Sequence, residues 1–119
     1  MQSNDEQEIL NETQAFAAFT EDAVRVGAFG DIQRGRAEIA AAYNKLLHQT
    51  MPGAILKQER GHVRMFSANL AVWQAGIDIL LSDGTLLRGY VVQVMKKVEG
   101  RWLILEAHPK LFPSPPAVR

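Results

Sequence analysis

An acid and an imidazole lie two residues apart near the end of the chain, where Glu106 and His108 occur in the stretch RWLILEAHPKLF. Apolar residues alternate from Trp102 onward, which predicts a strand that carries Glu106 and His108 on one face. An imidazole exchanges protons near neutral pH, and a neighbouring carboxylate can fix its tautomer. The pair predicts a proton-transfer or ligand-binding site, or else a hydrogen-bonded histidine beside a solvated acid.

Asp78 is the second candidate for acid–base chemistry. It lies in the middle of an apolar stretch, residues 70–81, and burying a carboxylate without a partner is costly. Asp78 therefore has a partner, such as Gln93 or Arg88, or it is the acid of a site whose apolar surroundings let it act as a base near neutral pH. Asp78 and His108 are the candidate catalytic residues.

Helical patterns come first in the chain. Residues 5–19 predict one or two short helical segments. Residues 36–53 give the clearest helix, whose apolar stripe includes Tyr43, and Pro52-Gly53 ends it. A brief strand near residues 23–26 and a glycine-rich turn separate the two helical regions.

Strand patterns follow Gly53. Four runs rich in β-branched and aromatic residues are predicted as strands: 54–66, 70–81, 86–97 and 101–108. Asp83-Gly84 is a strong hairpin signal, and Glu99-Gly100 is a weaker one. The fold class is therefore α+β, with N-terminal helices packed on an antiparallel meander of about four long strands plus short N-terminal strands. One domain is expected over residues 1–112, followed by a proline-rich tail, 113–119.

The composition disfavours several function classes. Thirteen basic and thirteen acidic residues leave no net charge, which argues against a nucleic-acid partner. No apolar run is long enough to span a membrane, and the N-terminus does not resemble a signal peptide. The absence of cysteine excludes disulfides and fits a cytoplasmic location. The three histidines have no metal-ligand spacing, and nucleotide-binding motifs are missing, so neither a metal nor a cofactor is expected.

Three stretches resemble the NTF2-like superfamily, and within it the SnoaL-like and SgcJ/EcaC-type branch: EDAV at 21–24, GRAEI at 35–39 and GRWLILEAH at 100–108. The similarity covers roughly residues 13–110. It implies a cone in which a bent sheet lines a ligand cavity with its concave face and commonly packs against a second subunit with its convex face. It also implies a long first helix, which we expect to be short or absent because only about a dozen residues precede TQAFAAF.

Two-residue turns at Asp83-Gly84 and Glu99-Gly100 predict which side chains share a face of the sheet. One face then carries polar and apolar residues together: Gln74, Asp78, Val91, Gln93, Met95, Trp102, Ile104, Glu106 and His108. The other face is almost wholly apolar: Trp73, Ile77, Ile79, Tyr90, Val92, Val94, Leu103 and Leu105. A slip of one residue would exchange the two sets.

The mixed face is assigned to the cavity and the apolar face to a homodimer interface. The candidate ligand-binding residues are Tyr43, Gln74, Gln93, Trp102 and Glu106. The candidate dimer contacts are Trp73, Tyr90, Val92 and Leu103.

Three functions are open at this point. The first is binding of a small apolar or amphipathic molecule without chemistry. The second is an isomerase, cyclase or hydrolase of the SnoaL-like kind, with Asp78 and His108 moving a proton. The third is a purely structural or interaction protein whose cavity is filled by side chains.

Overall fold

The computed structural model describes residues 4–14 and 18–113. Its elements, in chain order, are α1 (Asn4–Gln14), β1 (Phe19–Val26), β2 (Ile32–Arg34), α2 (Arg36–Lys45), the π-helical turn η1 (Leu46–Thr50), β3 (Ile55–Gln58), β4 (His62–Ser67), β5 (Leu70–Leu80), β6 (Leu86–Val98) and β7 (Arg101–Leu111). The predicted tail, residues 113–119, lies outside the described residues except for its first position.

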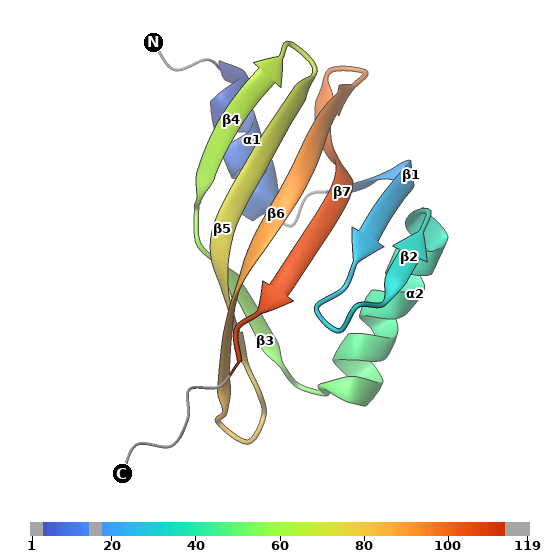
Figure 1. The fold of residues 1–119 in the computed structure, drawn as a ribbon, viewed down its shortest axis with the longest axis vertical. Coiled ribbons are helices and arrows are strands. Elements are labelled where there is room, and N and C mark those ends of the chain that lie inside the picture. Colours follow the sequence, from blue (N-terminus) through green and yellow to red (C-terminus); the bar gives the residue numbers. More distant parts are fainter. Residues whose placement is uncertain (1–3, 15–17, 114–119) are drawn as a thin grey trace.

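The strands form one seven-stranded sheet in the order β2-β1-β7-β6-β5-β3, with β4 also paired to β5 (Figure 1). All neighbouring pairs are antiparallel except β1 and β7, which run parallel. The predicted α+β architecture is confirmed. The single strand predicted over 54–66 is instead two strands, β3 and β4, which pair with different halves of β5.

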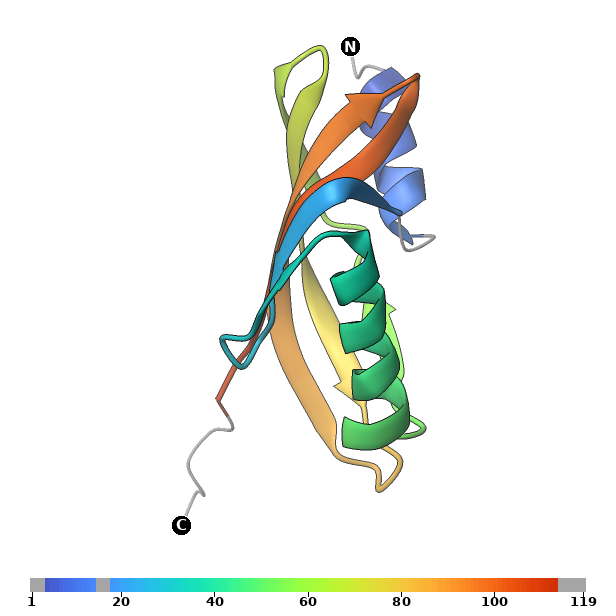
Figure 2. The same cartoon turned by 90° about the vertical axis from the view of Figure 1, so that its right-hand side faces the viewer.

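Both helices cover the same face of the bent sheet, α1 near one end and α2 toward the other (Figure 2). We call this the inner face and the opposite one the outer face. Ile9 of α1 is fully buried in a cluster with Trp73 and Trp102 on the inner face. α1 covers Asn4–Gln14 and Phe19 already belongs to β1, so the predicted helical pattern does not reach residue 19.

A polar contact fixes α1 to the sheet. Asp5 Oδ1 accepts hydrogen bonds from Lys97 Nζ at 2.9 Å and from Trp102 Nε1 at 3.1 Å. The bond from Lys97, followed by the bond from Trp102, lowers the pKa of Asp5 below its usual value of 3.8. The same partner raises the pKa of Lys97 above 10.5.

Replacing Asp5 with asparagine should weaken the docking of α1 in a pH-dependent way. Because the folded pKa of Asp5 is lowered, its contribution is present above the unfolded value and is lost as pH falls through the folded one. Asp5→Asn should therefore lower Tm at pH 7, and this effect should fade as pH falls below the usual carboxyl value of 3.8. Thermal unfolding of both proteins across this range checks the prediction, and an equal difference at every pH would contradict it.

The β5–β6 hairpin has a different register from the predicted one. Leu81 and Thr85 pair through the bond from Leu81 N to Thr85 O, so the loop contains three residues, 82–84, and Gly84 takes the left-handed conformation. The extra loop residue shifts the pairing by one position. Asp78 consequently lies opposite Arg88 rather than Gly89.

The β6–β7 hairpin begins in the predicted register. Val98 pairs with Arg101 across the two-residue turn, and Met95 still pairs with Ile104. A β-bulge then places one extra residue, Leu105, in β7, so that Val94 pairs with Glu106. A bulge reverses the alternation beyond it. Every residue after Leu105 therefore lies on the opposite face from the predicted one.

These two irregularities redistribute the side chains. Val91, Gln93, Met95, Trp102 and Ile104 are buried on the inner face, together with Trp73, Ile77 and Ile79. The alternation places Gln74, Asp78, Tyr90, Val92, Val94, Leu103, Glu106 and His108 on the outer face. The prediction that Trp73 is exposed on the outer face is wrong, because Trp73 is fully buried and its indole Nε1 donates to Arg60 O at 2.8 Å.

Candidate functional site

A hollow lies between the α2–η1 segment and the inner face of the sheet. Its wider part, the chamber, has a volume of about 540 Å³, and a narrower part, the recess, has a volume of about 100 Å³. The two parts share seven of the described lining residues: Tyr43, Leu46, Met51, Leu56, Gln58, Ile79 and Gln93. The chamber falls within the roughly 300–1,000 Å³ typical of small-molecule sites.

The start of α2 places Tyr43 over the hollow. The Arg36 guanidinium donates two hydrogen bonds to Phe19 O, at 3.1 and 2.8 Å, which tie the first turn of α2 to β1. Ile39 is 1% exposed and anchors the helix in the core. Tyr43 follows four residues later on the same helix face. Its ring lies 6.2 Å from the Phe19 ring, centroid to centroid.

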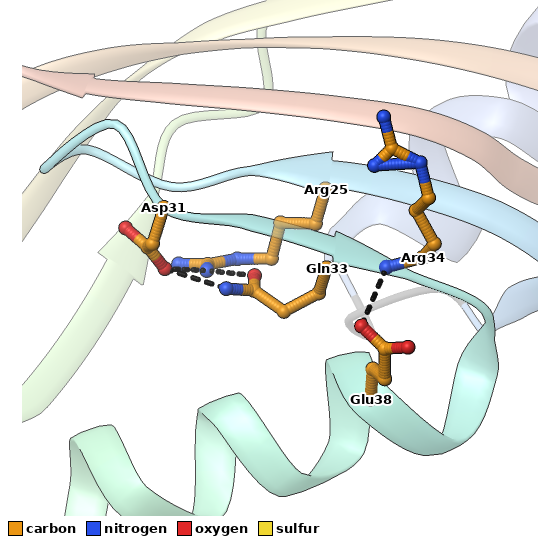
Figure 3. Close-up of polar contacts among 5 residues, drawn as sticks. All are labelled: Arg25, Asp31, Gln33, Arg34 and Glu38. Carbon is orange, nitrogen blue, oxygen red and sulfur yellow. Dashed lines mark hydrogen bonds and ion pairs between the residues drawn. The ribbon is translucent and has the colours of Figure 1, made fainter.

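A buried arginine enters the recess from β1 (Figure 3). Arg25 Nη1 donates to Gln33 Oε1 at 2.9 Å and lies 3.5 Å from Asp31 Oδ2. Gln33 Nε2 donates to the same Asp31 oxygen at 2.7 Å. The guanidinium carbon of Arg25 also lies 4.6 Å from the centre of the Tyr43 ring, a cation–π geometry. Contacts from the β1–β2 loop, from β2 and from α2 therefore hold the Arg25 side chain.

Asp31 remains ionised beside Arg25. The hydrogen bond from Gln33 is the largest cause that lowers the pKa of Asp31, and the charge of Arg25 acts in the same direction. Residue 27, in the loop between β1 and β2, is a glycine that leaves space for this carboxylate. A Cβ at position 27 would collide with the Asp31 carboxylate. Arg25 and Asp31 consequently form a neutral pair at the wall of the recess.

Two buried polar atoms of the hollow have no hydrogen-bond partner among the described residues: Gln93 Oε1 and Arg25 Nε. Gln93 is 6% exposed and Arg25 is 7% exposed, and both line the recess. Leaving a buried polar atom without a partner costs about 1–3 kcal/mol. Such atoms need an explanation, and a molecule that is bound in the hollow is one.

The structure brings together two of the predicted site residues, Tyr43 and Gln93, which line both parts of the hollow. Trp102 is 1% exposed and lies under α1, and it is not among the described residues that line the hollow. Gln74 is half-buried on the outer face, opposite His62 and Val92.

The predicted acid–base residues lie away from the hollow, on the outer face. Asp78 Oδ1 is 3.7 Å from Arg88 Nε, and both side chains are largely exposed. Glu106 Oε2 is 3.5 Å from His108 Nε2, with 44% and 45% of the side chains exposed. The placement of Glu106 and His108 in the cavity is wrong, because the bulge at Leu105 turns them outward.

Arg25 and Asp31 were missed by the sequence analysis. A signal existed, because the charged residue at position 25 lies between Val24 and Val26 and directly opposite Ala107 of the neighbouring strand. Asp31 follows Gly30 in a stretch that reads only as a turn. Its role depends on contacts with Arg25 and Gln33 that no local pattern encodes.

Solved structures of known proteins share this architecture. An NTF2-like protein with a cystatin-like fold from Novosphingobium aromaticivorans matches with a TM-score of 0.78 at 14% identity, over 92% of this chain and 83% of the other. A cystatin-like domain of unknown function from Nostoc punctiforme matches with a TM-score of 0.74 at 20% identity, over 91% and 73%. The chain has the NTF2-like, cystatin-like fold.

A third protein with the NTF2-like fold, from Novosphingobium aromaticivorans and provisionally assigned as a scytalone dehydratase, matches with a TM-score of 0.68 at 16% identity, over 96% of this chain and 78% of the other. No protein-family model matches the sequence, and no curated protein is similar to it in sequence. The likeness therefore establishes the fold alone.

No helix among the described residues has the length and apolar character needed to cross a membrane. Within the same residues, no group of three or more histidine, aspartate or glutamate side chains could hold a metal ion.

Proposed function

We propose that this protein binds a small, mainly apolar molecule in the hollow between α2–η1 and the inner face of the sheet. The observation that carries the proposal is the pair of unpartnered buried atoms, Gln93 Oε1 and Arg25 Nε, in the wall of a mainly apolar hollow. A purely structural core would fill such a space with side chains. Binding sites combine apolar walls with a few polar groups in this way.

An enzyme of the SnoaL-like kind, acting as an isomerase, cyclase or hydrolase, has less support. The fold is shared with the protein provisionally assigned as a scytalone dehydratase. Asp78 and His108 do not line the hollow, so proton transfer there would need other groups. The ionisable side chains among the described lining residues are Arg25, Asp31 and Tyr43. Binding therefore stands as the proposal.

Filling the hollow should abolish binding of the neutral fluorescent probe N-phenyl-1-naphthylamine. Ala42 lines the recess and Ala54 lines the chamber, so the double variant Ala42→Trp/Ala54→Trp should lower probe affinity at least about tenfold by occlusion. Fluorescence titration measures the affinity.

The matched control is Ala40→Trp/Ala41→Trp, which adds the same two side chains at exposed positions of α2. The control should bind the probe like the wild type. Equal binding by all three proteins, or none by the wild type, would contradict the proposal.

We further infer a homodimer through the outer face. Half-exposed apolar side chains form a continuous patch across β5, β6 and β7: Val72, Tyr90, Val92, Val94 and Leu103. Val72 and Val94 are directly paired, and Glu106 and His108 border the patch on the β7 side, opposite Val94 and Val92. A contiguous apolar surface on a small protein commonly marks an interface, and a two-fold axis lets one patch cover its copy.

A charge in the centre of the patch should separate the subunits. The wild type is expected at twice its chain mass of 13.2 kDa, and Val94→Lys at 13.2 kDa, because burying a lysine in an apolar interface is costly. Light scattering at micromolar concentration measures both masses. Ala41→Lys on the exposed face of α2 should remain a dimer. A monomeric wild type would exclude the interface.

A further inference from the structure

We infer that the molecule bound in the hollow is uncharged and carries, at one end of its apolar body, an oxygen that accepts a hydrogen bond from Arg25. This inference rests on the proposed function and specifies the class of ligand. The polar end lies in the recess and the apolar body fills the chamber.

The charge balance of the hollow carries the first step. Among the described lining residues, Arg25 and Asp31 alone are formally charged at pH 7, and they face each other at 3.5 Å. The chamber is lined by no charged residue within the described part of the chain. A ligand with a net charge would lose its hydration on entering the hollow. No opposite charge would replace that hydration, because Arg25 and Asp31 already neutralise each other, so binding would be strongly unfavourable. A neutral ligand pays no such penalty.

The position of the polar atoms carries the second step. Arg25 and Gln93 both line the recess, whereas Arg25 does not line the chamber. A guanidinium only donates hydrogen bonds, so the ligand must present an acceptor, such as a carbonyl, ether or hydroxyl oxygen. The Gln93 amide both donates and accepts, so it is compatible with a keto or a hydroxyl group.

The size of the two parts carries the third step. A recess of about 100 Å³ admits a small polar group, whereas the chamber of about 540 Å³ admits one or two rings or a branched chain. Arg25 Nε and Gln93 Oε1 are shielded in the empty hollow. Small side-chain rotations on ligand entry would let Arg25 Nε donate to the ligand oxygen and recover the cost of its missing partner. Gln93 would donate from Nε2 to a keto oxygen, whereas its Oε1 would accept from a ligand hydroxyl.

Four compounds with one apolar body test the inference by displacement of N-phenyl-1-naphthylamine at pH 7: biphenyl, 4-acetylbiphenyl, 4-phenylphenol and biphenyl-4-carboxylate. The ketone and the phenol should bind about tenfold more tightly than biphenyl, because each supplies the missing acceptor. The carboxylate should bind at least about tenfold more weakly than the ketone, because it is charged.

Two variants locate the effect. Arg25→Met should abolish the advantage of the ketone over biphenyl, measured as the ratio of the two affinities in the same variant. Gln93→Leu, which leaves the Arg25 network untouched, should reduce that advantage. Retention of the full advantage in Arg25→Met, or in Gln93→Leu where Arg25→Met does not fold, would overturn the inference.

The outcomes separate this inference from the proposed function. Equal binding of biphenyl and the ketone, or tightest binding of the carboxylate, would overturn the inference while binding in the hollow stands. Failure of the wild type to bind N-phenyl-1-naphthylamine or any of the four compounds would overturn the proposed function, and the inference with it.

Discussion

Replacing Gln93 with methionine is expected to stabilise the empty protein, raising its free energy of unfolding by about 1–2 kcal/mol. Gln93 is 6% exposed, and its Oε1 has no hydrogen-bond partner among the described residues. Methionine has a similar length, fills the same space and removes the unsatisfied oxygen. Urea unfolding of the wild type and Gln93→Met measures the difference.

The same substitution should weaken binding of 4-acetylbiphenyl, because the polar end loses one of its two partners. A substitution that raises the stability of the protein and weakens its ligand binding is typical at a residue that is retained for binding. Gln74→Met is the matched control, since Gln74 is a half-buried glutamine on the outer face of the adjacent strand. It should change stability by less than about 0.5 kcal/mol and leave probe binding unaltered. A loss of stability in Gln93→Met would show that Gln93 supports the fold.

Replacing Gly61 with alanine is expected to destabilise the protein by about 3 kcal/mol or more. Gly61 separates β3 from β4 and has a φ of +77°, which favours glycine. A Cβ at this position would collide with the backbone oxygen of Gln74 and would lie 2.7 Å from the Ala75 Cβ. It would also lie 2.9 Å from Trp73 Nε1, which donates to Arg60 O. The backbone cannot yield without disturbing the buried tryptophan.

Gly84 provides the control for backbone strain alone. Its φ is +91°, and an added Cβ would meet nothing within 4 Å. Gly84→Ala should therefore cost only about 1 kcal/mol. Urea unfolding of both variants compares the two sites. Equal losses would show that the contacts of Gly61 with β5 contribute nothing beyond strain.

The fold was predictable from local patterns because each element carries its own signal. The alternation of apolar residues in β5 to β7 and the stop at Pro52-Gly53 depend on neighbouring residues alone. The turn at Glu99-Gly100 was also placed correctly, since Glu99 and Gly100 both take positive φ in a two-residue hairpin. The resemblance to the NTF2-like superfamily predicted that the sheet is bent and that its concave face lines a cavity.

The faces of the sheet were harder to predict, because a single extra residue reverses them. The loop after Leu81 holds three residues rather than two, although Asp83-Gly84 is compatible with both lengths. The bulge at Leu105 lies in the run Leu103–Ile104–Leu105, where every residue is apolar and no pattern marks the irregularity. The two errors explain why Asp78 and His108 were assigned to the cavity.

The candidate site was predicted only in part for a related reason. Tyr43 and Gln93 were identified because helix and strand periodicity direct them inward. Arg25 was missed because a charged side chain is ordinarily placed toward solvent. Its burial depends on Asp31 of the β1–β2 loop, Gln33 of β2 and Tyr43 of α2. Such a set becomes visible only when the chain is folded.

A crystal structure of the protein soaked or grown with 4-acetylbiphenyl tests the central claim most directly. We predict electron density for the biphenyl between η1 and the inner face of the sheet, with the keto oxygen within about 3.2 Å of an Arg25 nitrogen. Density beside Glu106 and His108 on the outer face, with the space beneath Tyr43 empty, would contradict the account.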